Sequence, residues 1–597
     1  METLQYIGQE QPDTRFHDGG LRPVMGAWHR QVMRANREHP QWSQGTGFTY
    51  NHAPMLCRWR GAFYLMYLSS PVHEHDGFAN ALLMRSPDGS SWSQPQVVFP
   101  SIPVPPGVYA GEKADQLPRD AHTVVHHRMG FYIAPNGVLL VMTHHGVTSD
   151  IHVMPNSGYG MGRVVRRIHP DGTLDDIFVL RVNSQAGWKK EHFPYPWFEE
   201  SSDADFVEAC HALWKDPLAN GAWWEEERLD TGFFSLQGMR APSFYHLPDG
   251  RVAAIGKSGL CAISKDEGAS WTPIQKAPGI ISAGGKCWMT RTGDGGYAIV
   301  YNPSPDGQHR WPLAIITSRD GVHYDHMYCA GGEVAPMRYG GLLKDFGLNY
   351  IRGIMEGNDD APDGNTWLAY SMNKEDIWTL RLPPTIESEE QGDVRDCFAT
   401  MNSALLERWY LYSPLWAEVT LRDGCLELHD SDPWDVAKAI RPFRPGNCKQ
   451  ITVQISAHSP ENGLLQLDVT DARGMVAARV ELERDGQIHV RGGDGCWPVG
   501  TYAADHMLEL SLCLDAGDQS FTLWIDGAAC PRQPFMCPVP APERLVLRTG
   551  KPWMTPTPED ELKDVCLPDL QDAGERLPEV FYRIASVMIL DEVGKRA

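Results

Sequence analysis

The chain has 597 residues, of which 22% are charged and 42% hydrophobic, as expected for a globular protein large enough to form two domains. Its formal net charge of −23, with no basic run, disfavours nucleic acid and anionic membranes as partners. The 13 cysteines lack zinc spacing, no stretch approaches 18 apolar residues, and the first residues lack the features of a signal peptide. We therefore expect a cytoplasmic protein without a metal site or cofactor.

Glycine turns followed by short apolar strands recur through the first two thirds of the chain. Each turn predicts a hairpin that enters a buried strand. Six candidates span about 390 residues, or about 65 residues per repeat, and this spacing suggests a radial β architecture with six blades, leaving five or seven open. The turn dipeptides are Arg60-Gly61, Asn136-Gly137, Asp171-Gly172, Asp249-Gly250, Gly295-Gly296 and Asp363-Gly364.

Three segments share a second pattern, in which an aspartate and a glycine precede an aromatic residue. They are Ser86-Pro-Asp-Gly-Ser-Ser-Trp92, Ser264-Lys-Asp-Glu-Gly-Ala-Ser-Trp271 and Ser318-Arg-Asp-Gly-Val-His-Tyr324. The aspartate can accept backbone N–H groups across the turn, while the aromatic ring packs between strands. The pattern resembles the Asp-boxes of sialidases and related β-propellers, and it predicts structural roles for Asp88, Asp266 and Asp320.

The segment 189–231 interrupts the repeat and is rich in Trp, Glu and Pro. We expect a loop with a short helix on the rim, and a lid that offers aromatic surface to a sugar is the alternative. A polar connector then leads, from about residue 402, to strands with alternating polar and apolar residues, typical of a β-sandwich. The expected domains are 1–385 (propeller, catalytic), 386–401 (connector) and 402–597 (sandwich). The run 521–527 resembles hairpins of concanavalin-like and laminin-G-like sandwiches.

In a propeller, catalytic groups come from different blades, so the candidates are polar residues at positions where a core strand should be apolar. Arginines near the predicted strands could converge on the axis and bind a carboxylate or sulfate through two hydrogen bonds. Local pairing with an acidic residue is the alternative for each of them. These candidates are Arg240, Arg310, Arg338 and Arg352.

Glycoside hydrolysis commonly needs two carboxyl groups, one of which acts as a general acid. Glu333 and Glu356 have small or apolar neighbours, and we expect burial to raise their pKa values. Asp76 is a third candidate. Tyr350 precedes Glu356 by six residues and is included as a catalytic candidate. Lys374 and Glu375 are expected to pair locally.

Histidines flank the early strands. His52 and His126 are candidate catalytic bases, and His127, Lys286 and Trp288 complete the expected substrate-binding set. The scattered histidines lack the H-E-x-x-H spacing of zinc enzymes, so a metal site is not expected.

The first 380 residues or so resemble the bacterial sialidase-like (BNR-repeat) six-bladed β-propeller proteins. The segments that carry this resemblance are Asn51-His-Ala-Pro-Met55, Arg128-Met-Gly-Phe-Tyr-Ile-Ala-Pro-Asn-Gly137, Gly162-Arg-Val-Val-Arg166, Tyr350-Ile-Arg-Gly-Ile354 and Asn373-Lys-Glu-Asp-Ile-Trp378. In sialidases an arginine cluster binds the substrate carboxylate, and a Tyr assisted by a Glu is the nucleophile. The resemblance implies comparable roles for Tyr350 and Glu356.

We therefore expect a sialidase-like, exo-acting glycoside hydrolase that acts on a small acidic oligosaccharide. A propeller lyase is the alternative, with His52 or His126 as base and Arg240 neutralising a uronate. A third hypothesis is a non-catalytic protein that binds an oligosaccharide or polysaccharide fragment. A homo-oligomer is left open.

Overall fold

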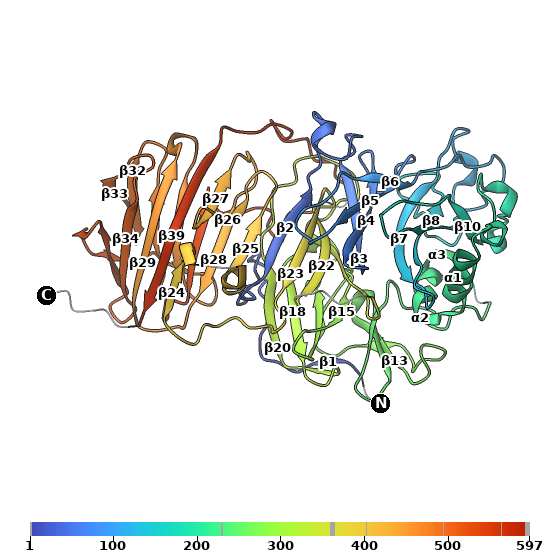
Figure 1. Ribbon diagram of the computed structural model, residues 1–597, viewed down its shortest axis with the longest axis horizontal. Coiled ribbons are helices and arrows are strands. Elements are labelled where there is room, and N and C mark those ends of the chain that lie inside the picture. Colours follow the sequence, from blue (N-terminus) through green and yellow to red (C-terminus); the bar gives the residue numbers. More distant parts are fainter. Residues whose placement is uncertain are drawn as a thin grey trace.

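The protein is described here from a computed structural model that covers residues 3–228, 231–358, 364–400, 403–493, 495–562 and 564–591, without the side chains of 126–129 and 403–405. Figure 1 shows two β-rich parts along the long axis, the propeller on the right and the C-terminal sandwich on the left. This arrangement confirms the predicted all-β fold of a propeller followed by a sandwich. Within the described residues, none of the helices is long and apolar enough to span a membrane.

Four blades of the propeller are separate four-stranded antiparallel sheets. The first two consist of β3 (Tyr50–Trp59), β4 (Ala62–Ser70), β5 (Asn80–Ser86) and β6 (Gln96–Phe99), and of β7 (Val124–Ile133), β8 (Leu139–Gly146), β9 (Gly162–Ile168) and β10 (Phe178–Val182). The next two consist of β11 (Ser243–His246), β12 (Val252–Ile255), β13 (Leu260–Ser264) and β14 (Gln275–Lys276), and of β15 (Trp288–Arg291), β16 (Tyr297–Tyr301), β18 (Leu313–Ser318) and β20 (His326–Gly331).

A fifth four-stranded unit closes the propeller by combining both ends of this domain. β21 (Phe346–Gly353), β22 (Thr366–Met372) and β23 (Asp376–Leu382) pair in sequence, and the N-terminal β2 (Trp28–Met33) adds the outer strand. The described residues thus form five units, within the expected range but one fewer than the favoured six. The additional turn, Asp171-Gly172, lies between β9 and β10 of the second blade, which already contains the turn at Asn136-Gly137. Asp363 lies outside the described residues.

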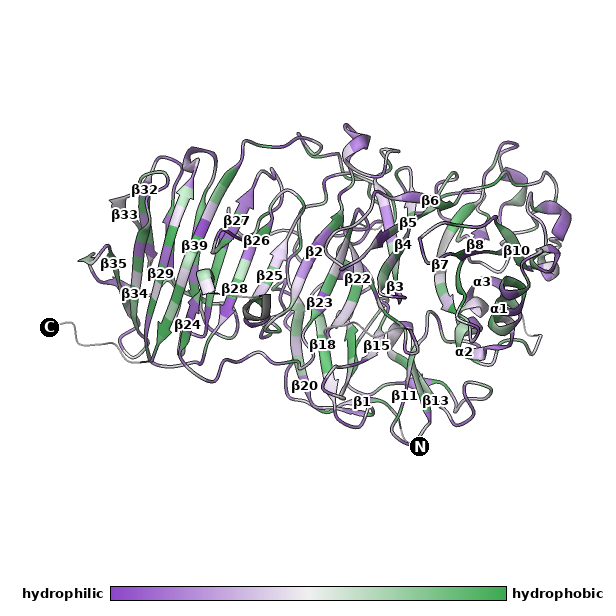
Figure 2. Ribbon diagram, viewed as in Figure 1, coloured by the Kyte–Doolittle hydropathy of each residue, from purple (hydrophilic) through white to green (hydrophobic). Residues whose placement is uncertain are grey.

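The burial of each strand follows from what covers its two faces. β4, β8, β21 and β22 are buried along their whole length, because neighbouring blades cover both faces. In the sandwich, β29 (Cys448–His458) instead alternates between buried and more exposed residues. Figure 2 shows the resulting alternation of apolar and polar bands along the sandwich strands. This difference explains why period-two patterns identified the sandwich and continuous apolar runs identified the blades.

The three Asp-turn-aromatic segments join the third and fourth strands of their blades. The Oδ1 atom of Asp88 accepts the backbone N–H groups of Ser90 and Ser91 at 2.8 Å each. Asp266 accepts the N–H group of Ser270 at 2.8 Å, and Asp320 accepts those of Val322 and His323. These carboxylates hold the turns in place.

A helical insert follows the second blade. α1 (Ala204–Lys215) is capped at its N-terminus by Asp203, whose side chain accepts the N–H groups of Asp205 and Phe206. Apolar residues of α1, including Phe206 and Leu213, pack against the second blade. α2 (Pro217–Asn220) and α3 (Trp224–Glu227) follow, and the insert covers the outer part of this blade (Figure 1).

The sandwich has two antiparallel layers around one apolar core. One layer contains β25 (Tyr410–Ser413), β28 (Lys438–Pro442), β38 (Arg544–Thr549), β30 (Leu465–Thr470), β31 (Val476–Leu482), β32 (Gln487–Gly492) and β33 (Gly495–Thr501). The other contains β26 (Val419–Arg422), β27 (Cys425–Asp430), β39 (Val580–Leu590), β29, β34 (Leu508–Asp515), β35 (Ser520–Ile525) and β36 (Ala528–Ala529). β24 (Val394–Cys397), in the expected connector, pairs with β39.

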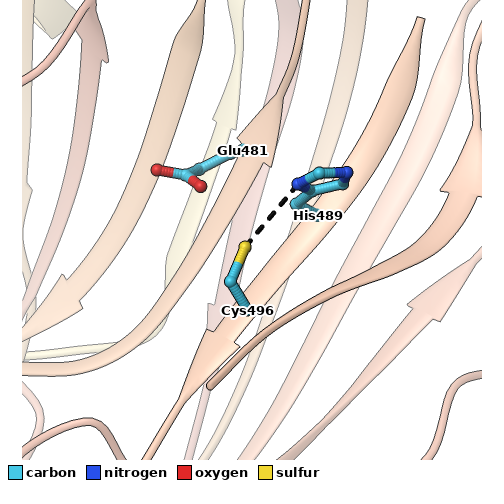
Figure 3. A group of neighbouring side chains, drawn as sticks. All are labelled: Glu481, His489 and Cys496. Carbon is cyan, nitrogen blue, oxygen red and sulfur yellow. Dashed lines mark hydrogen bonds between the residues drawn. The ribbon is translucent and has the colours of Figure 1, made fainter. Parts of the chain in front are cut away.

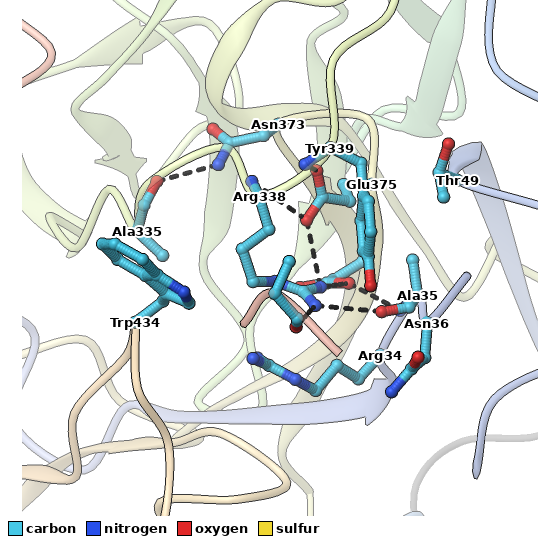
Figure 4. Close-up of polar contacts among 12 residues, drawn as sticks. Arg34, Ala35, Asn36, Thr49, Ala335, Arg338, Tyr339, Asn373, Glu375 and Trp434 are labelled. Atoms are coloured by element: carbon cyan, nitrogen blue, oxygen red, sulfur yellow. Dashed lines mark hydrogen bonds and ion pairs between the residues drawn. The ribbon is translucent and has the colours of Figure 1, made fainter. Parts of the chain in front are cut away.

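The propeller and the sandwich share a continuous sheet and a buried set of charges. β2 of the fifth blade pairs in parallel with β25 of the sandwich. At this junction Arg338 pairs with Glu375 at 3.0 Å and with Asp376 at 2.6 Å, while Arg34 pairs with Asp432 of the sandwich at 2.8 Å. Figure 4 shows Arg34 and Arg338 side by side in this network. The two domains are therefore joined by buried interactions rather than by a free linker.

Candidate functional site

Several charged side chains meet where the first strands of the blades begin. The loops that join the second and third strands of each blade lie at the same end of the propeller. One hydrogen bond shows this directly: Asn51 N–H, at the start of β3, donates at 2.9 Å to the carbonyl of Lys374, in the loop between β22 and β23. This topology brings together residues that are about 300 positions apart in the sequence. We call the group formed by Tyr350, His52, Lys257, Lys286, Lys374 and Glu74 the Tyr350 cluster.

Tyr350 occupies the centre of this cluster. Its backbone has a φ of 52°, and the register of β21 shifts between Asn349 and Arg352, so the regular alternation of the strand is interrupted there. Lys257 Nζ donates a hydrogen bond to Tyr350 Oη at 2.7 Å, and Lys286 Nζ lies 4.4 Å from the centre of the ring. Two ammonium groups thus contact the phenol, one at its oxygen and one over its face.

His52 packs against the same ring. The two ring centres are 4.4 Å apart, and His52 Nδ1 hydrogen-bonds Ser371 Oγ at 2.7 Å. Burial holds the pKa of His52 well below its usual range, and the positive charges of Lys374 and Lys286 lower it further. His52 is therefore a neutral imidazole at physiological pH.

Further ion pairs surround these groups. Lys374 Nζ lies 3.0 Å from Glu74 Oε2 and 3.1 Å from Asp345 Oδ2, and Arg310 pairs with the same Asp345 oxygen at 3.2 Å. Although burial raises the pKa of Tyr350, the positive charges of Lys257 and Lys374 outweigh this effect and hold it below the usual value of 10. The cluster thus stabilises the phenolate form of Tyr350 relative to that of an ordinary tyrosine.

A small cavity of about 100 Å³ adjoins the cluster at Lys286. Trp288, Arg352 and Glu356 also line it, so four of the expected site residues surround one space. Arg352 donates to the carbonyl of Ala241 at 3.2 Å, and the Oε2 atom of Glu356 accepts from His246. Glu356 is thus bound to a histidine at the rim rather than to Tyr350.

Two expected catalytic carboxylates lie in other environments. Glu333 is at the domain junction, where Lys438 of the sandwich contacts it at 2.7 Å and Tyr410 donates a further hydrogen bond. The expectation of a raised pKa is wrong for Glu333: burial raises it, but Lys438 more than compensates and lowers it to about 2. Asp76 accepts the N–H groups of Val72 and His73 and so stabilises a turn. Their catalytic roles stay untested predictions.

The four arginines do not form one cluster. Arg240 is held at 2.8 Å by Glu225 of the helical insert, and Arg338 belongs to the junction network of Figure 4. Arg310 belongs to the ion pairs that surround the Tyr350 cluster, and Arg352 lies beside the adjoining cavity. The side chains of His126 and His127, on β7, lie outside the described part of the structure.

Sequence reasoning missed three members of the Tyr350 cluster, namely Lys257, Lys374 and Glu74. The local pairing expected for Lys374 and Glu375 is wrong, because Lys374 binds Glu74 and Asp345 while Glu375 pairs with Arg338 and Lys344. The position of these residues in the sequence could have identified them. All three lie in loops between the second and third strands of a blade, and these loops reach the end of the propeller where the first strands begin.

Among the described residues, one group has the composition of a metal site. Figure 3 shows Glu481, His489 and Cys496 on the adjacent strands β31, β32 and β33. Both oxygens of Glu481 are already engaged, one by Gln466 at 2.7 Å and the other by Arg491 at 2.7 Å. A guanidinium at this distance opposes a cation, so these residues do not fit a metal ion well.

Comparisons with known proteins agree with this architecture. The family model "BT_1020-like, N-terminal beta propeller" matches residues 2–240, and the model "Sialidase-like, CBM domain" matches residues 409–564. A solved structure named "Sialidase" matches with a TM-score of 0.95 at 38% identity, covering 99% of this chain and 54% of that one. The chain therefore spans about half the length of that relative. No curated protein matches it.

A solved Trypanosoma rangeli sialidase in complex with sialic acid aligns over 98% of this chain and 97% of its own, with 10% identity and a TM-score of 0.33. The family models and the structure named "Sialidase" together define a two-domain protein of sialidase-like architecture. This chain thus resembles the structure named "Sialidase" over 99% of its length, and its C-terminal domain matches a sialidase-like CBM model. These matches confirm the predicted sialidase-like β-propeller with a C-terminal sandwich.

Proposed function

We propose that this protein is an exo-acting glycoside hydrolase that cleaves an acidic sugar from a small oligosaccharide, with Tyr350 as nucleophile. The observation that carries the proposal is the contact of Tyr350 with two lysines, because a phenol is a useful nucleophile only when its pKa is lowered. The same cations would attract a substrate carboxylate to this end of the propeller.

In the proposed reaction, the Oη atom of the Tyr350 phenolate attacks the anomeric carbon, the bond from this carbon to the glycosidic oxygen breaks, and a water molecule gives that oxygen its proton. The hydroxide that remains then attacks the anomeric carbon, which breaks the bond to Tyr350, releases the sugar and restores the phenolate. Lys257 stabilises the phenolate before attack, and Lys286 and Arg310 contribute positive charge near the bound sugar acid. Glu74 positions Lys374 and limits the total positive charge of the cluster.

The test is covalent trapping. Activated fluorinated glycosides of acidic sugars slow the second step, so the intact mass should increase by one sugar residue and peptide mapping should place it on Tyr350. Tyr350→Phe should remove both the adduct and at least about 10²-fold of kcat, the scale of a lost nucleophile. An adduct on another residue, or full turnover by Tyr350→Phe, would reject the assignment.

One observation favours a second candidate, a lyase that acts by β-elimination on a uronate. The neutral His52 lies against Tyr350, and an imidazole base beside a tyrosine and cations that neutralise a carboxylate suits this chemistry. A lyase would yield a 4,5-unsaturated product that absorbs in the ultraviolet, with no covalent adduct. A hydrolase yields saturated products and an adduct, and a non-catalytic binder yields neither.

A further inference from the structure

A larger cavity lies between the two domains, away from the Tyr350 cluster. It has a volume of about 460 Å³, within the range of sites for small ligands, which often form between domains. The propeller contributes the N-terminal segment 15–18 and the loop 332–335, and the sandwich contributes β28, β30, β38 and the loops 473–476 and 552–554. We call this space the junction cavity.

Ion pairs between and within the domains fix the walls of the junction cavity. Lys438 of the sandwich contacts Glu333 of the propeller at 2.7 Å, and Arg479 binds both oxygens of Asp468 at 2.6 and 2.9 Å. The ring of His17 hydrogen-bonds the carbonyl of Pro556 at 2.6 Å, which fastens the N-terminal segment to the sandwich. The cavity is thus pre-formed, and a ligand would not need to order its walls.

The lining of the junction cavity is more cationic than the protein as a whole. The acidic lining residues are Asp18, Glu333, Asp435 and Asp468. The basic ones, excluding His17, are Arg15, Lys438, Arg473, Arg479, Arg544 and Arg548. The chain carries a net charge of −23, so this local excess of arginine and lysine is unusual. It favours an anionic ligand.

Arg473 offers the open contact for such a ligand. Its side chain is exposed and makes no hydrogen bond or close ion pair among the described residues, although its charge helps to lower the pKa of Asp13. The other lining arginines have acidic partners in direct contact. A guanidinium without a partner can bind a carboxylate through two parallel hydrogen bonds. A carboxylate entering here would not have to displace an existing ion pair.

The same cavity has aromatic surface. Trp553 and Phe16 line it, and Phe16 leaves 43% of its surface exposed. Aromatic faces match the C–H faces of a sugar ring.

We propose that the junction cavity is a second saccharide-binding site, which takes an acidic saccharide built from uronic acids. Arg473 binds the carboxylate of the sugar, and Trp553 and Phe16 offer aromatic surface to the sugar rings. Both domains contribute to the site, so it exists only in the full chain. It is separate from the Tyr350 cluster and does not depend on the hydrolase assignment.

The test measures binding of two trisaccharides of the same linkage by calorimetry, a β-1,4-linked glucuronate trimer and the neutral glucose trimer. The protein is the full chain with Lys257→Glu, which lowers the net charge of the Tyr350 cluster by two and weakens its attraction for acids. We expect the acidic trimer to bind at least about 10-fold more tightly than the neutral one, as one charge-assisted contact implies. Arg473→Ala should remove this preference, and Trp553→Phe should weaken both trimers several-fold.

Arg395→Ala is the matched control, since this arginine is exposed on β24 and contacts Asp393 and the Sδ atom of Met588 at 3.5 Å each, away from the junction cavity. This variant should bind both trimers as before. Near-ultraviolet circular dichroism checks that each variant is folded. The proposal is overturned if the Lys257→Glu protein binds no acidic trimer at millimolar concentration, because binding then belongs to the propeller alone. It is also overturned if Arg473→Ala and Trp553→Phe leave both affinities unchanged.

Discussion

Replacing Lys257 by methionine removes the ammonium that lies 2.7 Å from Tyr350 Oη and keeps a side chain of similar length. A hydrogen bond from a charged donor contributes about 2 to 3 kcal/mol, and here it stabilises the phenolate that attacks the sugar. Each 1.4 kcal/mol corresponds to a tenfold change, so kcat/KM should fall by about 30- to 100-fold at neutral pH. Lys286 and Lys374 remain, and the loss should therefore be smaller than that of Tyr350→Phe.

The sign of the pH effect follows from the charges around the phenol. Lys257 is the largest of the influences that lower the pKa of Tyr350, so its removal raises that pKa and leaves less phenolate at neutral pH. The rising limb of the pH profile of kcat/KM should move to higher pH, measured with nitrophenyl glycosides of acidic sugars. Lys265→Met changes an exposed lysine of the same blade and should alter neither quantity. Equal losses in both variants, or an unshifted profile for Lys257→Met, would refute the proposed role.

Three further substitutions separate structural from functional roles. Glu333→Gln should lower the unfolding free energy by about 3 kcal/mol at pH 7, because the pKa of Glu333 is near 2 in the folded protein and 4.5 in the unfolded chain. This stability difference should vanish as the pH falls from 4.5 to 2. A catalytic Glu333 would instead lose activity at unchanged stability. Asp88→Ala should lower stability in urea by about 1 to 2 kcal/mol through its lost turn bonds, unlike the exposed control Asp115→Ala. Arg338→Met should cost about 3 to 5 kcal/mol by leaving buried acids unpaired, and the activity per folded molecule should persist unless this arginine binds substrate.

The sequence was a good guide to the fold because both domains have strong local signals. Turn glycines and continuous apolar runs indicated strands covered on both faces, and alternating residues indicated the sandwich. The number of blades was harder to predict. Asp171-Gly172 has the same local form as the turns between first and second strands, but it joins β9 to β10. Its position within a blade depends on pairing with β8, which a turn dipeptide does not reveal.

The closure of the propeller by its N-terminal strand could not be predicted from local sequence either. β2 pairs with β23, about 350 residues away, and so completes the fifth blade while its other edge meets β25 of the sandwich. Nothing in the short sequence of β2 specifies either partner. Local sequence also could not predict the environments of Arg338 and Glu333. Both residues form ion pairs at the junction of the two domains, and that junction was not part of the prediction for either domain.

The site itself was predicted in part, and the missing part has a physical explanation. His52 was found because it lies beside an early apolar strand, and Tyr350 because it lies near Glu356 and resembles the tyrosine of sialidases. Lys257 and Lys374 lie in turns, where a lysine is ordinary. What distinguishes these two lysines is contact with groups of other blades, Tyr350 for Lys257 and Glu74 for Lys374, and this contact arises only when the blades close around the axis. In a propeller, therefore, charged residues in the loops between second and third strands are candidates for the site together with polar residues in the first strands. Both lysines satisfy that criterion, because Lys257 follows the second strand of its blade and Lys374 follows the second strand of the fifth.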